Sequence, residues 1–100
     1  MKKQPDLTEL GKRLTDIDFS LMTLLARRNE IVRAVARVKM ATGQKFIRLN
    51  VENDRIKAAK KWAKENGVDP NYAAQIMYSV INESCKQQLA ELQKGIQTPS

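Results

Sequence analysis

The chain has 100 residues, the size of a single domain, with 42% apolar residues and a formal net charge of +7. It contains no histidine, so the usual side chain for acid–base chemistry at neutral pH is absent. Its single cysteine, Cys85, excludes an internal disulfide and a cysteine metal cluster. The positive charge favours an acidic partner, either a small anion or a polyanion.

The sequence carries no signal that is typical of export or of membrane insertion. Met1-Lys2-Lys3 is not followed by the apolar run of a signal peptide. No stretch approaches the roughly 18 consecutive apolar residues that a membrane-spanning helix requires. Together with the single cysteine, these features predict a cytoplasmic protein with no membrane partner.

The first predicted element is a long amphipathic helix. Residues 1–5 are expected to be a disordered start, after which Asp6 or Thr8 can cap the helix. The apolar residues of the helix recur in alternating steps of three and four, which is the spacing of a heptad seam. They are Leu7, Leu10, Leu14, Ile17, Leu21, Leu24, Ile31, Val35 and Val38.

The predicted length of this helix implies a second chain. No Pro or Gly interrupts residues 12–42, and Gly43 is a good stop signal, so the helix is expected to run from residue 7 to about residue 41. At about 1.5 Å per residue it is roughly 50 Å long, whereas a compact domain of this size has a radius of gyration of about 13 Å. One chain cannot cover such a seam, so the sequence predicts a dimer.

A second, shorter helix is predicted after the connection of residues 45–50. Asn50 is its expected N-cap, and Asn66-Gly67 is expected to end it after Glu65. Its predicted buried residues are Val51, Ile56, Ala59, Trp62 and Ala63.

A third helix is predicted to begin with Asp69 as the N-cap and Pro70 in the first turn, where the missing N–H costs little. It is expected to fray near Lys94-Gly95. The sequence therefore predicts an all-α fold with three helices per chain, a helical domain over residues 6–94 and a flexible tail over residues 95–100.

Two cations fall on the apolar stripe of the first helix. The heptad register predicts an apolar residue between Leu24 and Ile31, but that position is Arg28. Lys39 follows about three turns later, on the same face and about 16 Å away. Burying an unpaired charge is costly. Either these side chains hold an anion, or Arg28 pairs with a buried carboxylate and Lys39 extends to solvent.

Amide, hydroxyl and carboxylate side chains occupy comparable positions on the other two helices. Ser84 and Gln88 continue the inward face of the third helix at a spacing of four residues. Gln88 can donate to a bound oxygen without adding charge, although hydrogen bonding between helices is the alternative. Glu52 lies beside Arg48 and Arg55, where capping and surface pairing worth less than about 1 kcal/mol are the alternative.

The order of these residues along the chain resembles a known family. The first helix carries the pattern Leu10-x-x-x-Leu14-x-x-Ile17-Asp18-x-x-Leu21-x-x-Leu24-Leu25-x-x-Arg28, followed by Val35 and Lys39. The later matching positions are Glu52, Tyr72, Ser84 and Gln88. Over roughly residues 6–92 the chain is similar to the all-helical chorismate mutases.

The resemblance implies a fold and a reaction. Members of this family are intertwined homodimers with three helices per chain. They convert chorismate to prephenate in aromatic amino-acid biosynthesis, through a pericyclic rearrangement that uses no cofactor, no metal and no covalent or general acid–base step. Catalysis comes from holding a flexible dianion in a reactive conformation and from placing charge at the ether bond that breaks.

The resemblance also implies a role for each matching polar residue. Arg28 would bind a substrate carboxylate, and Lys39 would contact a carboxylate and the ether oxygen. Gln88 would donate to the ether oxygen from the other side. Glu52 would take the ring hydroxyl, and Ser84 would assist a carboxylate.

Three positions depart from the pattern of the family. Gly11 replaces an Arg that reaches into the pocket of the partner chain, Arg48 replaces a loop Asp, and Val51 replaces an Arg of the second helix. Losing one charge-assisted contact to a carboxylate costs about 1.5–3 kcal/mol, so impaired rate or binding is expected. Arg48 and Arg55 are the candidate replacement cations, and Arg48 is therefore included among the substrate-binding residues.

Other functions stay open at this point. Gly11 and Val51 favour a mutase-like protein with weak or no activity that binds a metabolite or pairs with another enzyme. A related enzyme could act on an isochorismate- or aminochorismate-like dianion. Nucleic-acid binding has only the +7 charge in its favour. No recognition motif is present and the aromatic residues do not alternate with basic ones, so no nucleic-acid partner is expected.

Overall fold

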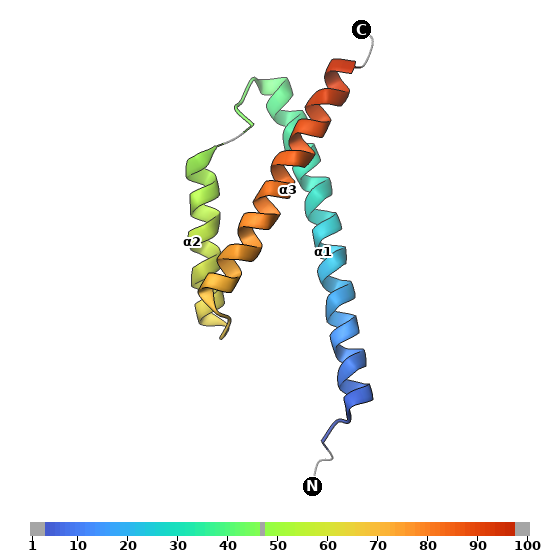
Figure 1. Ribbon diagram of the computed structural model, residues 1–100. Helices are drawn as coiled ribbons and strands as arrows, with labels where there is room; N and C mark the ends of the chain where they lie inside the picture. The colour runs from blue at the N-terminus through green and yellow to red at the C-terminus, as the bar shows by residue number, and fades with distance from the viewer. Residues whose placement is uncertain (1–3, 47, 98–100) are drawn as a thin grey trace. The chain divides into compact units, whose positions relative to one another are not determined.

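The computed structural model describes residues 4–46 and 48–97, with side chains as far as Gly95, and over these residues it contains three α-helices and no strand. Helix α1 spans Leu7–Thr42, α2 spans Leu49–Glu65 and α3 spans Pro70–Gln97 (Figure 1). The predicted all-α class, with three helices and a long first helix, is confirmed. The predicted disordered start and flexible tail fall partly on residues 1–3 and 98–100, which lie outside the described residues.

Helix α1 begins and ends where the sequence predicts. The side chain of Asp6 caps it, because its Oδ1 accepts a hydrogen bond from the backbone N–H of Glu9 at 2.8 Å. At the other end, Gly43 adopts a positive φ of 70°, a conformation that glycine reaches without steric cost. The helix is uninterrupted between these signals.

Helix α2 begins earlier than predicted. Arg48 takes the N-cap position with an extended backbone and no side-chain cap, so the prediction that Asn50 caps this helix is wrong. The backbone N–H groups of Val51 and Glu52 donate to the Arg48 carbonyl at 3.0 and 3.1 Å. Asn50 therefore lies inside the first turn, where its side chain cannot act as the cap.

The turn between α2 and α3 follows the prediction. Asn66 ends α2, and Gly67 adopts a positive φ of 70°. Asp69 then caps α3, because its Oδ1 accepts a hydrogen bond from the N–H of Asn71 at 3.0 Å. The helix continues through Gly95 to Gln97, past the position at which the sequence predicts a tail.

The chain divides into two units, which are described separately. In the unit formed by Val32–Ser100, α2 and α3 run antiparallel and pack against each other (Figure 1). Ile56, Ala74 and Ile81 form the core between them, and Met77 packs against it. Trp62 was predicted to be buried in this core but is 59% exposed, so that prediction is wrong. Small side chains allow the two helices to pack closely, and the indole ring lies outside.

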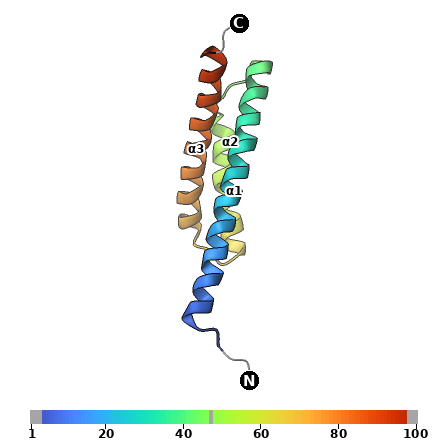
Figure 2. The ribbon, with the colours of Figure 1, turned by 90° about the vertical axis from the view of Figure 1, so that its right-hand side faces the viewer.

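The last turns of α1 belong to the same unit and are joined to α3. Arg33 Nη1 donates to Gln87 Oε1 at 3.0 Å, and Arg37 Nη1 lies 3.5 Å from Glu91 Oε2. Ala36, between these two arginines, is fully buried. In both views this part of α1 lies beside the C-terminal half of α3 (Figures 1 and 2).

The unit formed by Met1–Ile31 contains the greater part of α1. Its seam residues are largely exposed, with Leu14 at 62% and Ile17 at 63%. A helix of this kind gains most of its stability from packing its apolar face. Contiguous apolar stripes on a surface are typical of sites that contact proteins, membranes or ligands.

We expect Ile81→Ala to lower the free energy of unfolding by about 2–4 kcal/mol, because it opens a cavity in the core between α2 and α3. Leu49→Ala is the control, since Leu49 is 70% exposed, and it should change stability by no more than about 0.5 kcal/mol. Urea unfolding at one fixed protein concentration measures both. Equal losses in the two variants would show that this core is wrongly placed.

Candidate functional site

Lys39 lies where three segments of the Val32–Ser100 unit meet. Its Nζ donates to Gln88 Oε1 on α3 at 2.9 Å and to the backbone carbonyl of Phe46, in the connection, at 2.7 Å. The side chain is half-buried and comes from the last turns of α1. An ammonium carries three N–H donors, so these two bonds leave capacity for one further acceptor.

The surroundings of Lys39 lower the pKa of its ammonium below the ordinary value of 10.5. Burial is the largest cause, because it penalises the charged form, and the positive charge of Arg48 is the second. Cys85 and Glu52 act in the opposite direction and raise the pKa. Two like charges close to each other are the arrangement that a bound anion stabilises.

Glu52, in the first turn of α2, lies across from α3. Cys85 Sγ donates to Glu52 Oε1 at 3.6 Å, which places the carboxylate against the α3 face that also carries Gln88. Burial raises the pKa of the Cys85 thiol most, and the hydrogen bond and negative charge of Glu52 raise it further. Charge effects therefore connect Lys39, Glu52 and Cys85 with one another. The charge of Arg48 acts on Lys39.

Ser84 and Gln88 both face inward, as the sequence predicts. They are 8% and 9% exposed. Ser84 Oγ donates to the Val80 carbonyl of its own helix at 2.9 Å, whereas Gln88 is bonded to Lys39 across the helices. The structure therefore brings Gln88 to Lys39 and leaves the Ser84 hydroxyl donating along α3.

Arg28 belongs to the Met1–Ile31 unit, where its side chain is half-buried. Whether it shares a site with Lys39 stays a prediction. Gly11, in the same unit, has an ordinary helical backbone, and a Cβ added to it would meet no atom within 4 Å. Nothing in this unit therefore requires glycine at position 11.

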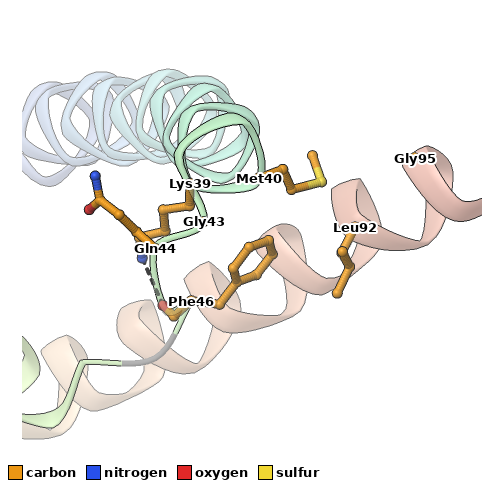
Figure 3. A pocket seen from close by; sticks show the side chains of 7 residues that line it. All are labelled: Lys39, Met40, Gly43, Gln44, Phe46, Leu92 and Gly95. Carbon is orange, nitrogen blue, oxygen red and sulfur yellow. Dashed lines mark hydrogen bonds between the residues drawn. The ribbon is translucent and has the colours of Figure 1, made fainter.

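A pocket of about 440 Å³ opens beside Lys39 (Figure 3). Its walls are mostly apolar, and Lys39 brings the only charged side chain among the residues that the structure places around it. The lining residues are Lys39, Met40, Gly43, Gln44, Phe46, Leu92 and Gly95. Within the described residues, no group of three acidic or cysteine side chains could hold a metal ion.

Sequence reasoning did not single out two of these contacts. Cys85 stands three residues before Gln88, a spacing that places both on one helix face and could have identified the thiol. The Phe46 carbonyl is a backbone group, and no residue pattern in the connection indicates that Lys39 bonds to it.

Comparison with known proteins identifies the class. The family model described as "Chorismate mutase type II" matches residues 10–89, which include every candidate site residue. The chain therefore belongs to the type II chorismate mutase family, as its resemblance implies. It is also 28% identical over 99 residues to a protein of Enterobacter agglomerans described as "Bifunctional chorismate mutase/prephenate dehydratase". The match covers 99% of this chain and 26% of that relative. In the part of the chain that the structure describes, none of the helices has the length and apolar character of a membrane span.

We expect Arg48→Gln to raise the pKa of Lys39 and Glu52→Gln to lower it. The Arg48 charge favours the neutral amine, and the Glu52 charge favours the ammonium. A titration of the Lys39 side chain by NMR, with its signal assigned through Lys39→Arg, measures both shifts. Asp54→Asn is the control, since Asp54 is exposed and contributes no resolved effect on Lys39. Shifts with the opposite signs would mean that the charges around Lys39 are wrongly assigned.

Proposed function

We propose that this chain, as a homodimer in the cytoplasm, rearranges chorismate to prephenate. The observation that carries the proposal is the pair formed by the Lys39 ammonium and the Gln88 amide, which are joined at 2.9 Å between two helices. Membership of the chorismate mutase family supports the reaction class. The substrate and the activity of this particular chain are the proposal.

Lys39 and Gln88 can together stabilise charge on the ether oxygen as its bond to the ring breaks. Gln88 accepts from Lys39 through Oε1, so its NH₂ group is the end that remains for a substrate oxygen. Lys39 has capacity for one more acceptor. Donors held in place before the substrate arrives lower the barrier without reorganising during the reaction.

The other candidates bind the rest of the dianion. Arg48, close enough to lower the pKa of Lys39, supplies a second cation for a carboxylate, and Arg28 supplies another from the α1 seam. Glu52 accepts the ring hydroxyl, and Ser84 assists a carboxylate when its hydroxyl turns away from the Val80 carbonyl to which it donates in this structure. This arrangement orients a flexible substrate in its reactive conformation and needs no proton transfer.

A second copy of the chain is the proposed cover of the α1 seam. The apolar residues of the Met1–Ile31 unit are exposed, including Leu21, Leu24 and Ile31. They continue a heptad spacing that fits another helix of the same kind. Burying this stripe in a homodimer also accounts for the exposed apolar residues without a different partner.

The cation set of this chain predicts modest activity. Gly11 and Val51 stand at two positions where family resemblance implies arginine. Each missing charge-assisted contact costs about 1.5–3 kcal/mol, which corresponds to roughly a 10- to 150-fold loss. A mutase-like protein without turnover, or an enzyme for a related dianion, would be distinguished by assaying chorismate consumption and identifying the product.

We expect Lys39→Ala to reduce kcat/KM for chorismate by about 100- to 1,000-fold, because it removes the cation at the ether oxygen. Gln88→Ala should cost about tenfold, the loss of one neutral hydrogen bond. Lys57→Ala removes an exposed lysine of α2 and should leave kcat/KM unchanged. Ultraviolet detection of chorismate consumption measures all three. Full activity in the Lys39 and Gln88 variants would reject the site.

We expect Gly11→Arg to raise kcat/KM about tenfold or more, because it restores a guanidinium that family resemblance directs into the partner's pocket. The matched control is Gly11→Ala, which should stabilise α1 by about 1 kcal/mol without raising activity. Kinetics and thermal unfolding separate the two effects. An equal gain of activity in both variants would show that helix stability, and not the missing cation, limits the rate.

A further inference from the structure

One residue of the connection between α1 and α2 is partly withdrawn from solvent. Among its described residues, 43–46 and 48, only Phe46 is half-buried, and the others are exposed. The Phe46 ring lines the pocket together with Met40 from α1 and Leu92 from α3 (Figure 3). Phe46 is therefore the residue of the connection that lines this pocket together with residues of both helices.

The backbone of the same residue binds Lys39. The Phe46 carbonyl accepts a hydrogen bond from Lys39 Nζ at 2.7 Å, which is drawn as the dashed line in Figure 3. A lysine ammonium on its flexible stem loses rotamer entropy when it is fixed. Gln88 Oε1 provides one fixed acceptor from α3, and the Phe46 carbonyl provides the second from the connection.

We propose that Phe46 is a positioning residue for Lys39, because its ring anchors the connection in the pocket so that its carbonyl holds the ammonium toward the substrate. The inference rests on the proposed function for its effect on the reaction. The position of the Phe46 ring and carbonyl in the structure does not depend on that function. Phe46 does not act on the substrate, and its effect passes entirely through Lys39.

The anchor also contributes to the environment that shifts Lys39. The charged and titratable groups around the ammonium are Arg48 at the start of α2, Glu52 in its first turn and Cys85 on α3. Burial has the largest effect on the Lys39 pKa, and the connection covers the ammonium on one side. Releasing the ring exposes Lys39 to water and moves its pKa upward, toward the ordinary value of 10.5.

The test compares Phe46→Ala with Phe46→Leu, which keeps an apolar anchor, and with Leu49→Ala as an exposed control in the same region. The first readout is the NMR titration of Lys39 in the full chain, which requires no activity. Phe46→Ala should raise the Lys39 pKa and speed the exchange of its Nζ protons with water. Phe46→Leu should keep the Lys39 pKa and the Nζ exchange rate close to those of the unchanged protein. Leu49→Ala should change neither quantity.

The second readout is the kinetics with chorismate. Phe46→Ala should lower kcat about tenfold with a change in KM of less than about twofold, and Phe46→Leu should recover at least half of the lost kcat. Circular dichroism confirms that each variant is folded. If Phe46→Ala does not fold, Phe46→Tyr and Phe46→Leu should give graded shifts of the Lys39 titration.

The two readouts separate this inference from the proposed function. An unchanged Lys39 titration in a folded Phe46→Ala variant overturns the role of Phe46, whatever the activity. A wild-type chain that consumes no chorismate overturns the proposed function, while the NMR comparison still decides whether Phe46 positions Lys39. A loss of kcat in Phe46→Ala that Phe46→Leu does not recover also overturns the inference.

Discussion

The candidate site depends on one ammonium held at the junction of three segments. Lys39 is bonded at 2.9 Å to the Gln88 amide and at 2.7 Å to the Phe46 carbonyl. Gln88 is buried on α3, and the ring of Phe46 lines the pocket beside Lys39. Because both acceptors are neutral, they orient the lysine without cancelling its charge. A carboxylate in either place would form an ion pair and compete with an anionic ligand for the same cation.

Groups of both charge signs act on Lys39. Arg48 lowers the pKa of Lys39, whereas Glu52 raises it, so the site combines like charges that favour an anion with one carboxylate that can accept a hydroxyl. Glu52 is itself held by the Cys85 thiol at 3.6 Å. A neutral donor in that position orients the carboxylate and leaves its charge intact, just as the neutral acceptors do for Lys39. Both charged groups are thus held by uncharged partners, which leaves their charges available to a ligand.

Sequence reasoning predicted the parts of the structure that local physics determines. Asp6 and Asp69 cap helices, and Gly43 and Gly67 end them at positive φ, because these residue types satisfy backbone groups over a few positions. The inward placement of Gln88 followed from helical periodicity. The predictions for Asn50 and Trp62 were wrong. The backbone of Arg48 takes the N-cap position of α2, and the small core between α2 and α3 leaves the Trp62 ring exposed. The Phe46 carbonyl and the Cys85 thiol were missed because each acts through tertiary contacts that no short pattern encodes.

In the proposed homodimer, position 11 links the exposed seam of α1 to the proposed site. A glycine in the middle of a helix costs about 1 kcal/mol relative to alanine, and no atom within 4 Å of its missing Cβ explains the choice inside this unit. The partner that covers the seam is the remaining source of a constraint on position 11. In the proposed homodimer that cover is another copy of α1, so residue 11 of each chain faces its partner. In that proposed dimer, the contact that buries Leu10 and Leu14 also places residue 11 beside the partner, so seam packing and the supply of a cation from position 11 are one structural requirement.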